Sequence, residues 1–407
     1  MAAALTTQCC IAGGGPAGMM LGVLLARAGV EATVLEKHSD FLRDFRGDTV
    51  HPSTLEVLYE LGWLDAFLQR PHQKVEEIAA YVAGQRVPVA DLRHLPTRCK
   101  FVALMPQWDF LDFVAEQGRR YPGFHLVMEA EVDALIESGG AVAGVRARTP
   151  SGPLEVRASL TVGADGRHST VRSLAALPRR ELGAPMDILW MRLRRRSDDP
   201  AQVLGYTSQG HILVMIYRGD YWQCGLVIAK GGADALRAQG LEPFRQRLLG
   251  VAPWLGEERV QELQSWDEVK LLTVAVDRVE QWHRPGLLVI GDAAHAMSPV
   301  GGVGINLAVQ DAVAAANLLA APLAAGTLAA RDLERVARRR AWPTRATQAA
   351  QVAIQNRVIG RVLGGEAMPA NARLPLPLRL LQRWPWLRRL PARAVGLGVR
   401  PEHWRGN

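Results

Sequence analysis

The chain has 407 residues, of which 48% are hydrophobic and 22% charged, and this ordinary globular composition argues against intrinsic disorder. Its length exceeds one ordinary compact core and suits two intertwined domains. The formal net charge of +8 could attract an anionic cofactor or lipid, but no lysine-rich tail or known nucleic-acid motif accompanies it. We therefore expect no nucleic-acid partner.

The first residues lead directly into an apolar strand at 8–12 and leave no room for a signal peptide. The four cysteines have neither the spacing of a zinc site nor that of a disulfide framework, so we expect no metal. The apolar stretch 312–325 falls short of a membrane span. Together these features predict a reduced, cytoplasmic protein.

Strands and helices alternate at the start of the chain. The strand at 8–12 is followed by a glycine turn, an Ala/Leu-rich helix to residue 28 and a strand at 32–36, which together make a βαβ unit. The later elements are predicted as helices at 53–68 and 107–120, strands at 125–137, 142–149 and 154–162, alternating segments at 75–95, 188–194 and 211–218, a buried strand at 287–290, and helix after residue 308.

The glycine turn reads Gly13-Gly-Gly15-Pro-Ala17-Gly18, the G-x-G-x-x-G pattern between a strand and a helix. The first glycine permits a tight turn, the second lets the backbone approach a pyrophosphate, and the third allows close helix–strand packing. Glu36 ends the second strand, where an acidic side chain can bind ribose hydroxyls. This arrangement predicts a dinucleotide site, although a glycine-rich turn without a ligand is the alternative.

A second glycine-rich segment follows the strand at 287–290. Its glycines would let the backbone approach a flat ring, and the helix that begins there would direct its N–H groups and positive dipole at the ring. The predicted cofactor contacts of this segment are Asp292, Pro299, Gly302, Gly304, Ile305 and Asn306.

A third segment, Gly163-Ala-Asp165-Gly166, follows the strand at 154–162. Asp165 stands at the strand end and is a further candidate for cofactor binding. The alternative is a capped strand-to-helix turn in which Asp165 is only the N-cap.

In this order the three segments resemble those of the FAD-dependent group A flavin monooxygenases of the para-hydroxybenzoate hydroxylase fold, and the resemblance covers about residues 8–345. It implies FAD as the cofactor and NADPH or NADH as a transient co-substrate. Reduced flavin would then react with O₂ to give a C4a-hydroperoxide that hydroxylates an aromatic or similarly electron-rich small molecule. The resemblance also assigns cofactor contacts to Arg46, Gln107 and Lys37, each of which could instead be a solvated surface group.

Three alternatives remain open. The same fold could carry an epoxidase or a dehydrogenase/reductase, while the Trp-x-Trp-x-Ile motif of the halogenases is missing. A flavin-containing membrane-peripheral binding protein is a hypothesis from another class.

The resemblance predicts an α/β architecture, a Rossmann-like FAD-binding domain with an inserted antiparallel-sheet substrate domain and a C-terminal helical segment. The FAD-binding domain is predicted at 1–75, 97–182 and 278–345, the substrate-binding sheet at 76–96 and 183–277, and the helical tail at 346–407.

Substrate and catalytic residues are less well defined by the sequence. The inserted sheet should form one wall of the substrate cavity, and its candidate lining residues, which could equally be sheet core or sheet surface, are Trp190, Tyr206, Met215, Tyr217 and Trp222. His51 and His295 lie next to the cofactor segments and could titrate near neutrality. A lone histidine is more often structural, so His51 is only a weak catalytic candidate.

Arginines alternate with leucines and tryptophans between residues 374 and 405. Such a segment can lie on an anionic bilayer, or it can pack on its own protein with the arginine stems covering apolar surface. Pro385 and Pro391 would interrupt a long interfacial helix. The sequence therefore favours packing of this tail on the protein.

Overall fold

The larger sheet contains five neighbouring parallel strands. The computed structural model describes residues 3–42, 49–82, 85–199, 204–208, 210–364 and 374–406. Within them the sheet has the order β19-β20-β11-β1-β2-β8, and β10 and β9 extend it from β11. Its strands are β1 (Ala3–Ala12), β2 (Ala32–Leu35), β8 (Phe124–Val127), β9 (Glu131–Ser138), β10 (Ala141–Thr149), β11 (Gly152–Gly163), β19 (His283–Arg284) and β20 (Leu287–Val289).

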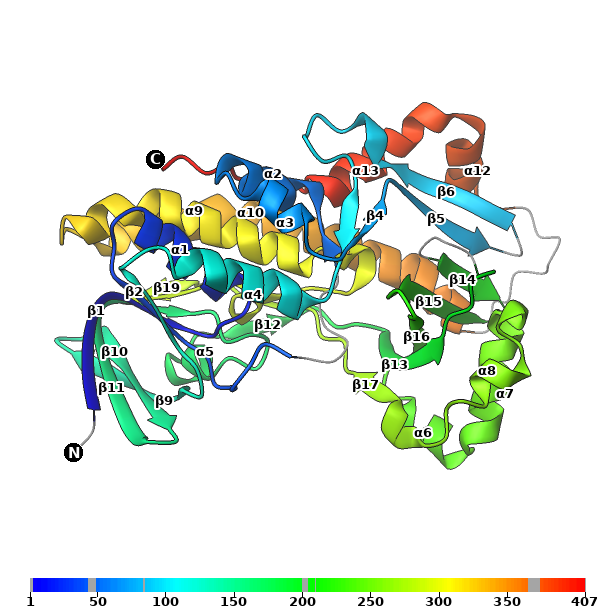
Figure 1. Cartoon of the computed structure of the whole chain (residues 1–407), viewed down its shortest axis with the longest axis horizontal. Helices are drawn as coiled ribbons and strands as arrows, with labels where there is room; N and C mark the ends of the chain where they lie inside the picture. The colour runs from blue at the N-terminus through cyan, green and yellow to red at the C-terminus, as the bar shows by residue number, and fades with distance from the viewer. Residues whose placement is uncertain are drawn as a thin grey trace.

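Long apolar helices cover this sheet. Ten of the twelve residues of α1 are buried, because Gly22 and Gly118 let α1 and α4 pack closely around Phe124. Figure 1 shows α1, α4, α9 and α10 as a layer above the strands. The helices of the described chain are α1 (Pro16–Arg27), α2 (Pro52–Glu60), α3 (Leu64–Leu68), α4 (Gln107–Gly118), α5 (Thr170–Leu174), α6 (Ala233–Ala238), α7 (Leu241–Val251), α8 (Glu257–Val260), α9 (Gly304–Ala324), α10 (Ala330–Ile354), α11 (Gly360–Leu363), α12 (Leu376–Arg383) and α13 (Arg389–Gly396).

A second sheet, mostly antiparallel, has the order β17-β13-β16-β15-β14-β5-β6. Two separate chain segments form it, and α6, α7 and α8 lie beside it in Figure 1. Its strands are β5 (Glu77–Val82), β6 (Gln85–Asp91), β13 (Met186–Arg194), β14 (Leu204–Ser208), β15 (His211–Tyr217), β16 (Tyr221–Ala229) and β17 (Lys270–Leu272). The mixed α/β fold with an inserted antiparallel sheet is confirmed.

Two small sheets complete the fold. They are β3 (Thr49–Val50), β7 (Val102–Leu104) and β4 (Gln73–Val75), and β12 (Arg179–Glu181), β18 (Asp277–Val279) and β21 (His295–Ala296).

Some elements differ from the sequence prediction. The helix predicted at 53–68 is two helices, α2 and α3, because Gly62 between them has a φ of +75°. The predicted strand at 125–137 is two strands, β8 and β9, and Glu129 between them has a φ of +55°. Residues 300–324, which include α9, are long and apolar enough to cross a membrane, but 67% of the apolar window is buried inside the protein. We interpret α9 as a core helix.

The last residues return to the helices that cover the larger sheet. The predicted tail boundary at residue 346 falls inside α10. After α13, the carbonyl of His403 accepts a hydrogen bond from Asn317 Nδ2 at 2.8 Å, and Glu60 accepts one from the Trp404 N–H at 2.7 Å. Helices α2 and α9 therefore hold the C-terminal residues in place.

Candidate cofactor-binding site

The predicted cofactor segments lie at one edge of the larger sheet. Strands β2, β1, β11 and β20 are parallel neighbours, with Ala12 opposite both Leu35 and Gly163, and Gly163 opposite Val289. Glu36 follows β2, and each of the three glycine-containing segments begins at or just after the end of β1, β11 or β20. Since ligands of open parallel sheets bind at the carboxyl ends of the strands, this edge is the candidate site.

The three glycine-containing segments touch one another. A Cβ atom at Gly13 would lie 2.4 Å from the carbonyl oxygen of Ala164, and one at Gly291 would lie 2.9 Å from the Cβ of Ala17. Arg167, from the segment after β11, lies 3.8 Å from the Asp292 carboxylate. The close approach of these backbones requires glycine at both positions.

Within the first turn the glycines have different roles. Gly13 has a φ of +107°, and a Cβ at Gly18 would lie 1.9 Å from the Gly13 carbonyl oxygen. Gly15 has a φ of −75°, and no atom of the described chain lies within 4 Å of its hypothetical Cβ. The fold therefore requires glycine at 13 and 18, while the space beside Gly15 suits a phosphate group.

Two helices begin at this edge without a side-chain cap. Among the described residues, no side chain caps α1 or α9, and neither has an acidic residue in its first turn. By contrast, α5 is capped by Ser169, whose hydroxyl accepts from the Arg172 N–H at 2.9 Å. Uncapped helix N-termini offer N–H groups and a positive dipole to anions, so both ends fit the charged groups of FAD.

The two acidic residues at the neighbouring strand ends hold backbone N–H groups. Glu36 accepts from Gly14 at 2.8 Å and from His38 at 3.1 Å, so it fixes the glycine turn. Asp165 accepts from the Ser169 hydroxyl at 2.5 Å and from the Val171 N–H at 3.1 Å. Asp165 therefore supports the start of α5, although Ser169 and not Asp165 is the N-cap. The carboxylate of Asp292, 34% exposed, is the more accessible acceptor.

The loop after Pro299 is held by β3, and the first turn of α9 is held by α2. The Gly302 carbonyl accepts from Thr49 Oγ1 at 2.7 Å, and Asn306 Oδ1 accepts from the hydroxyls of Ser53 and Thr54, both at 2.7 Å. The side chain of Asn306 is thus engaged by α2, while its backbone lies in the first turn of α9 next to Gly304 and Ile305.

His51 is placed as a structural residue. Its two ring nitrogens face carbonyl oxygens, Nδ1 that of Val395 at 2.8 Å and Nε2 that of Gly302 at 2.9 Å. Burial lowers the pKa of His51, and the two carbonyls only partly oppose this effect. Because both ring nitrogens face backbone carbonyl oxygens, one of which accepts from the ring N–H, the geometry does not favour His51 as a catalytic base.

Three glutamines bind backbone carbonyls near the site, and none of them was predicted from the sequence. Gln348 and Gln351 lie in α10, and Gln355 follows its last residue. Gln351 Nε2 donates to the carbonyls of Ser298 and Val300, at 2.9 and 2.7 Å, and Gln348 Nε2 donates to those of Asp277 and Ala296. One turn further on, Gln355 donates to a carbonyl at the start of the inserted sheet. Their spacing on one helix face is the only sequence signal of this role.

Asp311 is the second missed residue. Its carboxylate is fully buried and accepts from the Gly291 N–H at 3.1 Å, from His295 Nε2 at 2.6 Å and from Arg340 Nε at 2.8 Å. Burial alone would raise the pKa of Asp311, but His295 and Arg340 outweigh it and lower the pKa. His295 therefore belongs to a buried network that fixes the turn before Asp292.

Three further predicted contacts come from the resemblance. Lys37 is exposed just beyond β2, and Gln107 is half-buried at the first position of α4. Arg46 lies outside the described residues.

The inserted sheet has two apolar faces, and they separate the candidate substrate residues. Trp190 lies on the face that also contacts Val300 of the cofactor loop, and its ring covers Gly225, where a Cβ would be 2.8 Å away. The other four candidates pack in the core of the opposite face, with α7: Tyr206, Met215, Tyr217 and Trp222.

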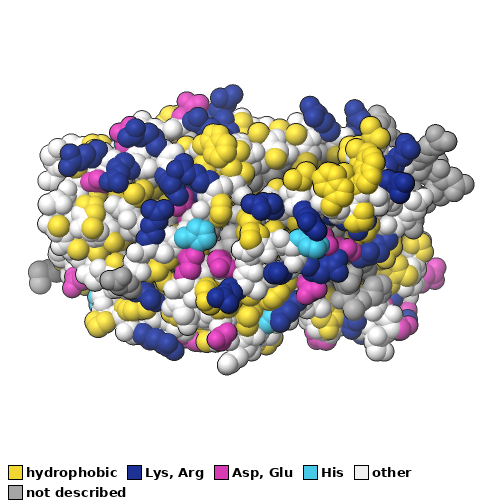
Figure 2. Space-filling model, turned by 90° about the horizontal axis from the view of Figure 1, so that it is seen from above, with side chains coloured by type: hydrophobic (Ala, Val, Ile, Leu, Met, Phe, Trp, Pro, Cys, Tyr) yellow, Lys and Arg dark blue, Asp and Glu magenta, His cyan; other side chains and the backbone are white. Residues whose placement is uncertain are grey.

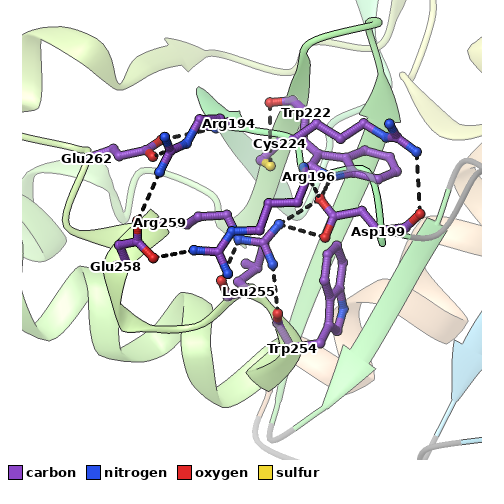
Figure 3. Close-up of polar contacts among 11 residues, drawn as sticks. Arg194, Arg196, Asp199, Trp222, Cys224, Trp254, Leu255, Glu258, Arg259 and Glu262 are labelled. Carbon is purple, nitrogen blue, oxygen red and sulfur yellow. Dashed lines mark hydrogen bonds and ion pairs between the residues drawn. The ribbon is translucent and has the colours of Figure 1, made fainter.

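Trp222 is also held by polar contacts. Figure 3 shows Trp222 and Arg259 converging on Asp199, with distances of 2.8 Å from Trp222 Nε1 and 2.6 Å from Arg259 to the nearest carboxylate oxygen. Burial would raise the pKa of Asp199, but hydrogen bonds from Arg259, the Arg196 N–H and Trp222 lower it. Met215 and Trp222 are therefore buried in the core of this face, Tyr206 and Tyr217 are half-buried on it, and Trp190 lies on the face next to the cofactor loop.

Comparisons with known proteins show the family of the chain. The FAD binding domain family matches residues 6–350. The chain is 35% identical to a 6-methylpretetramide 4-monooxygenase from Streptomyces rimosus over 88% of this chain and 86% of the relative. It is 28% identical to a rifampicin monooxygenase from Rhodococcus hoagii over 74% of this chain, and spans 61% of that protein's length.

Solved structures share the fold. An anhydrotetracycline hydroxylase from Streptomyces rimosus aligns with a TM-score of 0.75 at 24% identity, covering 97% of this chain and 77% of the other. A p-nitrophenol 4-monooxygenase from Pseudomonas putida DLL-E4 aligns with a TM-score of 0.74 at 19% identity, covering 98% and 100%. The predicted family, its FAD cofactor and its use of NAD(P)H are confirmed. The chain belongs to the FAD binding domain family and is an FAD-dependent monooxygenase of the aromatic hydroxylase type.

Proposed function

We propose that this enzyme hydroxylates a multi-ring phenol; one of its relatives is named as a 6-methylpretetramide 4-monooxygenase. One observation carries the proposal. Trp190 on the inserted sheet and Val300 of the cofactor loop belong to one apolar cluster, together with Ile188 and Val227. An apolar cluster with an indole ring next to the cofactor loop suits an aromatic ligand.

Residues at different strand ends would bind different parts of FAD. The space at Gly15 and the start of α1 would hold the pyrophosphate, Glu36 the adenosine ribose and Asp292 the ribityl chain, with the loop before Gly304 next to the flavin ring. When bound, FAD accepts hydride from NAD(P)H and supplies the electrons that activate O₂. The protein orients the substrate and excludes water from the reacting groups.

We also propose a cytoplasmic location and the predicted division into an FAD-binding domain, an inserted substrate-binding sheet and a helical tail. All four cysteines are buried free thiols, as expected in a reducing compartment.

A substrate screen tests the proposed function. Purified enzyme loaded with FAD would be mixed in air with NADH or NADPH and with single-ring or multi-ring phenols, and products would be analysed by mass spectrometry. We expect multi-ring phenols to stimulate NAD(P)H oxidation most and to gain one oxygen atom. Stimulation by alkenes or saturated polycyclic lipids, and not by phenols, would indicate epoxidation or dehydrogenation instead.

Two matched variants separate the faces of the inserted sheet. Trp190→Leu removes the flat contact and should raise KM for the multi-ring phenol about two- to twelvefold, since an aromatic pair contributes roughly 0.5–1.5 kcal/mol. Met215→Leu lies on the opposite face and should leave KM nearly unchanged. Equal KM values for both variants would contradict the assigned face.

A further inference from the structure

The C-terminal helices carry several solvent-exposed apolar side chains. Helices α12 and α13, with the 3₁₀ turn η7 (Pro385–Arg388) between them, pack on the edge strand β6. Ala392 is buried beneath them, in the cluster that contains Trp190. The outer side is different, because Leu376, Trp384, Trp386 and Leu390 are 47–64% exposed. The tail therefore packs on the protein through its inner side and leaves these four side chains exposed.

The same surface is strongly basic. Between residues 374 and 401 the sequence has six arginines and no aspartate or glutamate. Arg379, Arg383, Arg389 and Arg393 are exposed. Among the described residues, none of these four guanidinium groups lies within 4.0 Å of a carboxylate oxygen. Figure 2 shows hydrophobic side chains among Lys and Arg side chains at the end of the molecule that carries α12 and α13.

We propose that the outer surface of α12, η7 and α13, which we call the tail surface, binds peripherally to an anionic lipid bilayer. Tryptophan is the side chain that favours the membrane–water interface, and unpaired arginines attract anionic headgroups. A short amphipathic segment needs both contributions for stable binding, and the tail surface supplies both. A protein partner would use the same residue types, and the vesicle experiment below separates it from a bilayer.

The tail surface is well placed for an enzyme with an apolar substrate. Its inner side packs on the cluster that contains Trp190 and Val300, so a bound membrane would lie against the segment that covers the candidate substrate wall. This relation gives the contact a role, but the lipid proposal does not depend on the proposed substrate.

Point variants of the full chain test the proposal better than truncation. A chain that ends near residue 373 would lose the Glu402 carboxylate, which Arg339 contacts at 2.7 Å in the larger domain. Two double variants test the tail surface. One carries Trp384→Ser and Trp386→Ser, and the other carries Arg389→Gln and Arg393→Gln. The matched controls are Leu271→Ser, at a 40% exposed site on the opposite edge strand β17, and Arg237→Gln on α6.

FAD-loaded protein would be sedimented with vesicles of phosphatidylcholine alone or with added phosphatidylglycerol. We expect binding only to the anionic vesicles, weakened by salt, together with a blue shift of tryptophan fluorescence. Each arginine removed should lower the partition coefficient about fivefold, so the double arginine variant should lose about 25-fold. The double tryptophan variant should lose the blue shift, and both controls should bind like wild type.

Two results would overturn the proposal. One is the absence of binding to anionic vesicles at low salt. The other is wild-type self-association, seen by analytical ultracentrifugation, that the Trp384→Ser, Trp386→Ser variant abolishes, because the tail surface would then be an interface between two copies of the chain. NAD(P)H oxidation by each variant in the absence of lipid serves as the check on folding.

Discussion

Replacing Asp311 by asparagine should destabilise the enzyme and loosen its hold on FAD. The carboxylate is fully buried between His295, Arg340 and the Gly291 N–H. Breaking a buried charge pair by removing one partner costs roughly 3–5 kcal/mol. Since asparagine retains one acceptor oxygen, we expect about 3 kcal/mol in the free energy of unfolding. For a chain of this size that corresponds to a urea midpoint lowered by about 1 M.

The effect on FAD follows from the Gly291 contact. Asp311 fixes the turn that presents Asp292, and one lost hydrogen bond of roughly 1.4 kcal/mol would raise the Kd of FAD about tenfold. Flavin fluorescence titration of the apoprotein measures this Kd. The matched control is Asp187→Asn, a buried carboxylate of the inserted sheet that accepts from Lys230 and the Gly231 N–H. It should lower stability and leave the Kd of FAD unchanged.

The pH dependence of the Asp311→Asn effect has a definite sign. Because the folded-state pKa of Asp311 is lowered, its contribution to stability is fully present above the unfolded pKa of about 3.9 and is lost as the pH falls further. The difference in unfolding free energy between wild type and variant should therefore be constant from pH 7 to about 5 and shrink below about 4. A variant as stable as wild type at pH 7, or one that retains FAD fully, would refute this reasoning.

Gly15→Ala should leave the urea midpoint unchanged and raise the Kd of FAD at least about tenfold, because its methyl group would enter only the space assigned to the pyrophosphate. Gly13→Ala should instead lower the midpoint, because its Cβ would meet Ala164 at a positive φ. Gly225→Ala should displace the Trp190 ring and raise KM for the aromatic substrate without changing the Kd of FAD. Circular dichroism, flavin titration and steady-state kinetics measure these three outcomes.

The cofactor edge was predictable because each segment carries its own local signal. Glycine or aspartate directly after an apolar run indicates where a strand ends, and parallel strands bring their carboxyl ends together at one edge of the sheet. Gly13, Asp165 and Asp292 could therefore be placed at one edge from the sequence alone. The buried network that fixes the turn before Asp292 could not, since Asp311, Arg340 and Glu402 are far apart in the sequence and meet only in the folded chain.

Which face of the inserted sheet each candidate substrate residue occupies was not predictable from the sequence. Residues 186–191 of β13 are all buried, so the alternation that would separate a core face from a solvent face is missing. Trp190 and Met191 therefore look equivalent in the sequence. The structure separates them, because only the Trp190 face contacts Val300.

Oxygen transfer from labelled dioxygen tests the central claim most directly. FAD-loaded enzyme would be reduced with NADPH or NADH in the presence of the best phenol from the screen and then exposed to ¹⁸O₂. We expect a hydroxylated product that contains one labelled oxygen atom, and less of that product from Gly15→Ala at limiting FAD despite an unchanged urea midpoint. Product oxygen that comes from water, or a product formed equally well without bound FAD, would contradict it.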